Sequence, residues 1–324
     1  MRFASAWDRG ALALVALYLV CAQAAAQTWP DKPVKLIVNF PPGGVADTLA
    51  RNIAPSISEA IKQPVVVENK PGANGSIGAD AVAKSAPDGY TFLVTSGGAM
   101  TVDPFIYSSL PYDTQKDLIP VASLAIVRVF LMIHPSVPAK DFNEFVAYAR
   151  ANPGKLSYGS AGSGSSPHLA GEMFARAAKI QATHVPYKGA APALNDLLGG
   201  QIQYMFDPGP GLQHVAAGKL KVLAVASGKR ASRYPDIPTL AELGMNVDAD
   251  TTFGLYAPAG VRAAIVERMN KEVNRALAAP ALVDNMQKLG GDVLPLTIPE
   301  FVARQAADRT RYGAFIKEAG IKVE

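Results

Sequence analysis

The chain has 324 residues, of which 49% are hydrophobic and 18% are charged. This length favours two domains, and the composition excludes an intrinsically disordered chain. The formal net charge is only +4 and the basic residues are scattered along the chain, so we expect no nucleic-acid-binding surface.

The N-terminus carries the only apolar stretch that approaches the length of a membrane span. Two arginines precede the apolar run Ala11–Cys21, which is too short to cross the ~30 Å hydrocarbon core of a bilayer. The run ends in Ala24-Ala25-Ala26, a small-residue pattern typical of signal-peptidase sites. We therefore expect residues 1–26 to be a secretory signal peptide. Because Cys21 is the only cysteine, we expect no disulfide, thiolate nucleophile or cysteine-bound metal in the exported chain.

The first half of the exported chain alternates short β-branched strands with Gly- or Pro-rich loops and helical patterns, an order typical of parallel α/β folds. The apolar run 127–133 is interpreted as a connection between domains. The other predicted elements are a strand at 34–40, a helix at 46–62, a strand at 65–68, a helix with Ser76 as its N-cap, and strands at 90–95 and 119–126.

The same alternation restarts after Pro138. Asp141 and Glu144 have the spacing of a capping box and predict a helix at 142–150. No further strand is predicted after 253–257, and the absence of a fixed repeat period excludes a solenoid. The remaining predicted elements are a strand at 156–158, a helix with His168 near its start, strands at 182–186, 201–207, 220–226 and 253–257, and helices at 265–277 and 299–319.

Three loops that follow predicted strands are rich in glycine, at 41–47, 96–98 and 159–166, and the last two also carry serine hydroxyls. Open α/β sheets bind their ligands at the carboxyl ends of strands. These loops contain one acidic residue and no Lys or Arg, so they offer backbone N–H groups and helix N-termini, which suit a carboxylate or a phosphate. Ordinary turns between strand and helix are the alternative interpretation.

The sequence lacks the motifs of several other functions. The glycines at 72–78 have the wrong spacing for dinucleotide binding, and no P-loop is present. No G-x-S-x-G elbow exists, although an esterase that uses Ser163 or Ser166 with His168 stays open as an alternative. The four histidines do not have metal-ligand spacing. Asp207 precedes Pro208-Gly209-Pro210, and both a turn-forming role and a pocket role stay open for it.

Eight sequence blocks, taken together and in order, resemble one family. Two of them are Phe40-Pro41-Pro42-Gly43-Gly44-Val45-Ala46-Asp47 and His184-Val185-Pro186-Tyr187-Lys188-Gly189. The others lie at 29–33, 68–75, 86–91, 196–200, 235–239 and 254–258, so the blocks span essentially the whole exported chain. The sequence resembles Bug-type substrate-binding proteins of the tripartite tricarboxylate transporter family.

The resemblance implies a two-lobed α/β periplasmic binding protein of type II (Venus flytrap), in which each lobe is a mostly parallel five-stranded sheet flanked by helices. Lobe 1 is expected at 27–127 plus 253–324, and lobe 2 at 128–252. Such a protein has no catalytic activity and needs no cofactor or metal. It is expected to be a monomer that captures a small organic carboxylate between its lobes and delivers it to a two-component membrane permease. A periplasmic sensor that presents its bound form to a receptor stays open as the alternative.

The resemblance also implies that the loops at 40–47 and 159–166 hold the ligand's carboxylate, partly through bridging waters. Asp207 matches an acid that faces the amino group in amino-acid-binding relatives. The chain departs from the family pattern at Thr251-Thr252-Phe253, where the family often has Trp, and in the rigid loop after Asp207. The expected ligand-binding residues are Phe40, Gly43, Gly44, Val45, Asp47, Ser96, Gly97, Gly162, Ser163, Ser165, Ser166 and Asp207.

Overall fold

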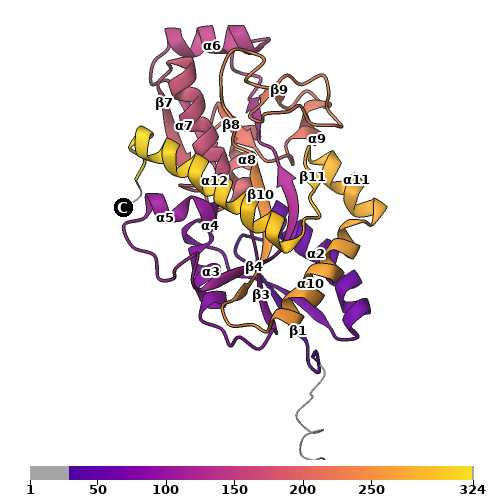
Figure 1. Ribbon diagram of the computed structural model, residues 1–324. Coiled ribbons are helices and arrows are strands. Elements are labelled where there is room, and N and C mark those ends of the chain that lie inside the picture. The colour runs from indigo at the N-terminus through magenta and orange to yellow at the C-terminus, as the bar shows by residue number, and fades with distance from the viewer. Residues whose placement is uncertain (1–28, 323–324) are drawn as a thin grey trace, which may run out of the picture.

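The computed structural model describes residues 29–322, so the expected signal peptide lies outside the described residues. Two β-sheets, each covered by helices, form the lower and upper parts of the molecule in Figure 1. Among the described helices, none is both long enough and apolar enough to cross a membrane.

The first sheet has six strands in the order β11-β4-β10-β3-β1-β2. Its strands pack against helices α2, α3 and α10, and side chains such as Leu36, Ile53 and Leu255 are fully buried between them. The bounds of these elements are β1 Val34–Val38, α2 Val45–Ile61, β2 Val65–Asn69, α3 Ser76–Ala83, β3 Thr91–Thr95, β4 Leu118–Val127, β10 Thr251–Pro258, α10 Ala263–Leu277 and β11 Asp292–Val293.

The second sheet has five strands in the order β7-β6-β8-β5-β9. In its buried core Phe145 of α6 stacks on Phe174 of α7, and the ring of Tyr204 meets both of them edge-on. The bounds are β5 Phe130–Ile133, α6 Phe142–Ala151, β6 Leu156–Ser160, α7 Ser166–Ala178, β7 Ala182–Pro186, α8 Ala190–Leu198, β8 Tyr204–Asp207, α9 Leu212–Val215 and β9 Lys221–Val225.

The expectation of mostly parallel five-stranded sheets is wrong in two respects. The first sheet has a sixth strand, β11, whose two residues are too few to produce a pattern in the sequence. Four of the nine pairs of neighbouring strands are parallel and five are antiparallel. The antiparallel pairs all involve β4, β5 or β10, the strands that border the two passages of the chain between the sheets.

Two local predictions are also corrected. The run 127–133 is not only a connection, because Phe130–Ile133 forms β5, a fully buried strand inside the second sheet. Ser76 is the first residue of α3 rather than its N-cap, and its hydroxyl donates to Asp103. The N-cap role of Asp141 is confirmed, since its side chain accepts a hydrogen bond from the amide of Glu144.

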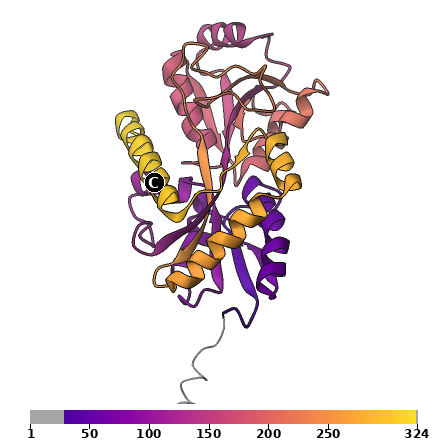
Figure 2. The ribbon, with the colours of Figure 1, turned by 45° about the vertical axis from the view of Figure 1, so that its right-hand side comes forward.

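Helix α12 (Ile298–Ala319) runs along one side of the molecule and contacts both parts, as the yellow helix of Figures 1 and 2 shows. Ile316 packs in one apolar cluster with Ile106 from the first part and Leu169 from α7. The guanidinium of Arg311 donates to the backbone oxygens of residues 248 and 250, just before the chain enters β10. The other described helices are η1 Ala73–Gly75, α4 Gly98–Thr101, α5 Asp103–Ile106 and α11 Pro280–Lys288.

Candidate ligand-binding site

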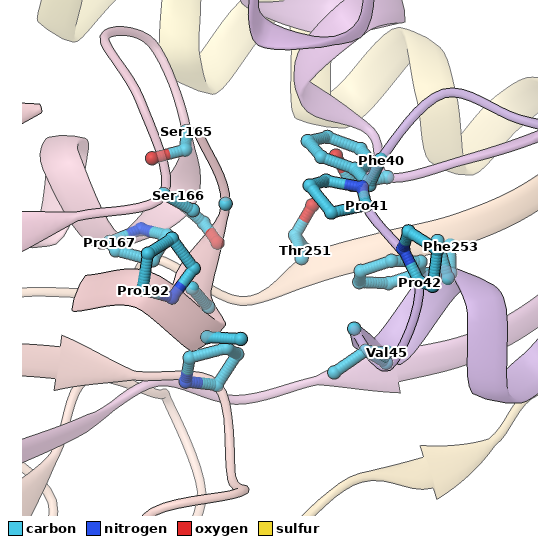
Figure 3. Close-up of a pocket in the computed structure, with 18 residues that line it drawn as sticks. Phe40, Pro41, Pro42, Val45, Ser165, Ser166, Pro167, Pro192, Thr251 and Phe253 are labelled. Carbon is cyan, nitrogen blue, oxygen red and sulfur yellow. The ribbon is translucent and has the colours of Figure 1, made fainter. Parts of the chain in front are cut away.

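A pocket lies between the two parts of the molecule and encloses about 600 Å³ of empty space, some of it open to solvent. Figure 3 shows Ser165, Ser166, Pro167 and Pro192 on one wall and Phe40, Pro41, Pro42, Val45 and Phe253 on the other. The full lining is Phe40, Pro41, Pro42, Gly44, Val45, Ala46, Ser96, Ala161, Ser165, Ser166, Pro167, Gly189, Ala190, Ala191, Pro192, Pro208, Thr251 and Phe253.

Three helices begin at this pocket. The N-cap residues are Gly44 for α2, Ser165 for α7 and Gly189 for α8, and none of them uses a side chain to bond the amides of its helix. The first-turn amides of a helix have no partner within the helix, and each N-terminus carries about half a positive elementary charge. The pocket is therefore favourable to an anion although its walls carry no cation.

Hydroxyl groups add to this neutral set of donors. Within residues 29–322, the structure gives no protein hydrogen-bond partner to the side chains of Ser96, Ser166 and Thr251. The hydroxyl of Ser165 donates to the backbone oxygen of Gly162 at 2.6 Å. None of the lining residues is charged. A carboxylate in this pocket would be held by hydroxyls, backbone N–H groups and helix ends.

The loop that begins at Phe40 is fixed from behind by the buried carboxylate of Asp47. One oxygen of Asp47 accepts from the amide of Gly43 at 3.0 Å, and Arg51 and Asn69 donate to the same carboxylate. Asn69 also donates to the backbone oxygen of Phe40 at 3.1 Å. Burial raises the pKa of Asp47, but the hydrogen bonds from Arg51, Gly43 and Asn69 outweigh it and hold that pKa below its ordinary value.

The loop on the opposite wall is fixed by two stacked histidines. The rings of His168 and His184 lie 4.1 Å apart, centroid to centroid. Nδ1 of His168 accepts from the amide of Gly164 at 3.0 Å, and Nε2 of His184 lies 2.7 Å from the hydroxyl of Ser160. Burial lowers the pKa of His168 to about 4 and that of His184 to about 3, so both rings are neutral near pH 7.

The structure brings half of the twelve expected site residues together. Those that line the pocket are Phe40, Gly44, Val45, Ser96, Ser165 and Ser166. Gly162 and Ser163 line an adjoining pocket that shares Phe40 with the first. Gly43 lines a separate groove beside Val45. Asp47, Gly97 and Asp207 lie outside the residues that line these pockets.

Asp207 holds the turn that follows β8. Its side chain is fully buried, and Oδ1 accepts from the amides of Gly209 and Gly211 at 2.7 and 2.8 Å. Burial raises the pKa of this carboxyl to about 6. These hydrogen bonds show the turn-forming role, one of the two interpretations that the sequence left open. The turn places Pro208 at the pocket.

The expected site residues omit the wall formed by Pro192, Pro208, Thr251, Phe253 and the start of α8, although the departures from the family pattern at 251–253 and after Asp207 marked two of these segments. Helix α8 has a usable signal, because Gly189 is followed by two alanines and then a proline in the first turn. Thr251 and Phe253 carry no local motif and were marked only by the departure from the family pattern. They lie far along the chain from the loops at 40–47 and 159–166 and reach the pocket because β10 begins at Thr251, where the chain returns from the second sheet and pairs with the end of β4.

Comparison with known proteins places the chain in a family. Residues 49–321 match the family described as tripartite tricarboxylate transporter family receptor. Protein BugT of Bordetella pertussis is 34% identical over 320 residues, which cover 97% of this chain and 98% of BugT. The aligned region covers nearly the full length of both proteins.

Solved structures agree. Rpa4515 of R. palustris, solved with adipate, has a TM-score of 0.87 and 33% identity, covering 91% of this chain and 99% of that one. MatC of Rhodopseudomonas palustris, solved with bound malate, has a TM-score of 0.83 and 31% identity, covering 88% and 99%. The fold is therefore that of a two-lobed periplasmic binding protein, and the esterase alternative is set aside because the family consists of receptors. The chain belongs to the tripartite tricarboxylate transporter receptor family and is a Bug-type solute-binding protein, not an enzyme.

Proposed function

We propose that this protein is a periplasmic receptor that captures a small organic carboxylate and delivers it to a two-component membrane permease. The observation that carries the proposal is the pocket itself, where three helix N-termini and three hydroxyls without a protein partner meet among residues 29–322 and no lining side chain is charged. The complexes of two relatives with adipate and malate support a carboxylate as the ligand class.

We place lobe 1 at 27–127 plus 253–324 and lobe 2 at 128–252. The strands of the two sheets support this division to within two residues, because the chain leaves the first sheet at Arg128 and Val129 and returns to it at Thr251, where β10 begins. Ligand between the lobes would contact both walls at once and so stabilise the closed arrangement. The contacts of α12 with both parts would oppose a wide opening.

The roles proposed for the site residues follow from their positions. Gly44, Val45, Ser96, Ser165 and Ser166 contact the ligand, and Phe40 forms the wall beside it. The remaining expected residues act from a distance: Gly162 and Ser163 border the adjoining pocket, Gly43 and Asp47 hold the first loop, Gly97 packs beneath Thr251, and Asp207 holds the turn at Pro208.

The proposed location and partner rest on the N-terminus and the family. The expected signal peptide at 1–26 would export the protein, and the family is named for a transporter that needs a receptor. The receptor is proposed to act as a monomer. Co-purification of the exported protein with the two permease subunits, strengthened by ligand, is the result that supports delivery to a transporter.

The binding proposal is tested by thermal unfolding of residues 27–324, refolded free of carried-over ligand, with a panel of carboxylates and their uncharged amides. A ligand present at about 100 times its Kd stabilises the native state by about 2.7 kcal/mol, which raises Tm measurably. We expect shifts with at least one carboxylate and none with its amide. Equal shifts with acid and amide, or no shift across the panel, would contradict carboxylate capture.

A further inference from the structure

Among the described residues that line the main pocket and the pocket adjoining it, only one side chain is charged. The main pocket is lined by no charged residue, and the adjoining pocket is lined by one, Lys188. The adjoining pocket also lies between the two parts, because Asn74 and Tyr107 of the first part and Ser163 and Lys188 of the second line it. An anion that approaches the cleft on this side therefore meets one cation and no carboxylate among the lining residues.

The charge of Lys188 is not offset by a bonded carboxylate. Its side chain is exposed, and within residues 29–322 its ammonium has no ion pair and no hydrogen-bond partner. Lys288, which lines the groove beside Val45, differs because it pairs with Asp284 at 2.6 Å. The field of an exposed charge extends about 10 Å at 0.1 M ionic strength before salt screens it, and a cleft with walls of low dielectric focuses that field.

Lys188 stands apart from the donors that would hold a bound carboxylate. Gly189, the next residue, is the N-cap of α8 and lines both pockets, as does Pro41 on the opposite wall. A Cβ at Gly189 would lie 3.2 Å from Cγ and Cδ of Pro41, so the two parts touch at this border between the pockets. Ser165 and Ser166 line the main pocket but not the adjoining one, whereas Lys188 lines the adjoining pocket but not the main one. The ammonium is therefore placed to act on a ligand that enters, not on one that is bound at the hydroxyls.

We propose that Lys188 is the capture residue of this receptor. Its charge draws the anionic ligand into the cleft and raises the association rate constant, kon, whereas the hydroxyls and helix ends of the main pocket set the dissociation rate constant, koff. The proposal rests on the proposed function, since it needs an anionic ligand in the main pocket. A charge at the rim of a binding site changes kon and its dependence on salt, whereas a charge paired directly with the ligand changes koff, so kinetics separate the two roles.

Stopped-flow measurement of tyrosine fluorescence on residues 27–324 tests the proposal. The probes are adipate and malate, or the acid of the carboxylate panel with the largest Tm shift if neither binds. Lys188→Gln removes the charge and Lys188→Arg keeps it. Lys219→Gln is the matched control, because Lys219 is also exposed and has no ion pair within residues 29–322, but lines neither pocket.

The expected effect is on association and depends on salt. At 0.01 M ionic strength, where the screening length is about 30 Å, we expect Lys188→Gln to lower kon at least about threefold and to change koff by less than about twofold. Lys188→Arg and Lys219→Gln should keep kon near the wild-type value. At 1 M salt the screening length falls to about 3 Å, so the loss of kon in Lys188→Gln should disappear.

Three results would overturn the role of Lys188 while keeping carboxylate capture. An equal loss of kon in Lys188→Gln and Lys219→Gln would trace the effect to the net charge of the protein. A faster koff with an unchanged kon in Lys188→Gln would place the ammonium against the bound ligand. Wild-type values of both constants in a folded Lys188→Gln variant would show that the charge has no part in binding. Failure of every acid of the panel to bind the wild type overturns carboxylate capture as well.

Discussion

Gly164, in the second part of the molecule, packs so closely against Asn74 of the first part that there is no room for a side chain, and His168 holds its backbone in place. A Cβ at Gly164 would collide with Cδ1 of Ile106 and lie 3.1 Å from Nδ2 of Asn74, both of which belong to the first part. Its amide donates to Nδ1 of the buried His168. The loop that carries Ser165 and Ser166 is thus fixed on both sides by groups that no ligand touches.

Replacement of Gly164 by alanine is expected to weaken carboxylate binding at least about tenfold. The added methyl group separates the walls, and alanine also resists the backbone φ of +84° at this position. Gly154→Ala is the matched control, since Gly154 has a φ of +74° and nothing within 4 Å of its Cβ position. Both variants should lose about 1 kcal/mol of stability from the positive φ, and Gly164→Ala should lose more because of the collision with Ile106. Only Gly164→Ala should lose affinity. Titration calorimetry that finds equal affinities would contradict the closing role of Gly164.

The neutral state of His168 predicts a pH-dependent stability. Its pKa is about 4 in the folded protein against about 6.5 when unfolded, so the unfolded state binds a proton first as the pH falls. This group therefore lowers the stability between pH 6.5 and pH 4, by about 2 kcal/mol at pH 5. His168→Asn keeps an acceptor for the amide of Gly164 and cannot be protonated there. The measured quantity is the free energy of unfolding of His168→Asn minus that of the wild type, obtained by urea unfolding at each pH. We expect this difference to be more favourable to the variant at pH 5 than at pH 7.5.

The wild type and His168→Asn must be compared with each other, because buried acids change the free energy of unfolding with pH in the opposite direction to His168. Burial raises the pKa of Asp103 to about 7 and that of Asp250 to about 6, so the folded state binds protons there before the unfolded state does. These groups stabilise the fold as the pH falls from about 7 toward 4. A wild-type curve alone would mix both effects. Parallel pH profiles for the wild type and His168→Asn would show that the imidazole of His168 is not responsible.

Asp47 is expected to act on affinity through the loop at 40–44. Asp47→Asn keeps the size of the side chain but removes the charge that Arg51 and the amide of Gly43 share. We expect a carboxylate Kd about tenfold or more higher and a stability loss of about 1–3 kcal/mol. Asp80→Asn is the control, because Asp80 also pairs with a basic residue four positions on, Lys84, in a helix away from the pocket. An affinity loss of the same size in both variants would contradict a role specific to the loop.

The order of strands and helices could be predicted because buried parallel strands and amphipathic helices leave a local pattern. Strands β1, β2, β3, β6 and β7 were predicted close to their observed positions. The strand β5 was hidden because residues 129–133 follow the apolar strand β4 with only Arg128 between them, so the passage at Arg128 and Val129 has no turn signal. Pairing direction was also hidden, since it depends on which strands enter from the other sheet.

In the site, too, features that depend on neighbouring residues in the sequence could be predicted, whereas features that depend on contacts between distant segments could not. The loops at 40–47 and 159–166 were predicted from glycines after strands, with serine hydroxyls as a further signal in the second loop, and both reach the pocket. Asp47 and Asp207 carry the chemistry of a site residue, but their partners are backbone amides and, for Asp47, also Arg51 and Asn69. No spacing in the sequence reveals which way such a carboxylate points. The apolar wall of the pocket is assembled from five separate segments, so no single sequence motif predicts it.

Substitution of Gly44 gives the sharpest test of the pocket. Gly44 has an extended backbone with a φ of −78°, which any residue adopts, and a Cβ would meet only the backbone oxygen of Pro41 at 3.5 Å. Gly44→Leu should therefore fold with a Tm close to that of the wild type, while its side chain occupies the pocket beside the start of α2. We expect carboxylate binding to fall at least about 100-fold, and Gly44→Ala to have an intermediate effect because it fills less space. Affinity retained by a folded Gly44→Leu variant would place the ligand elsewhere.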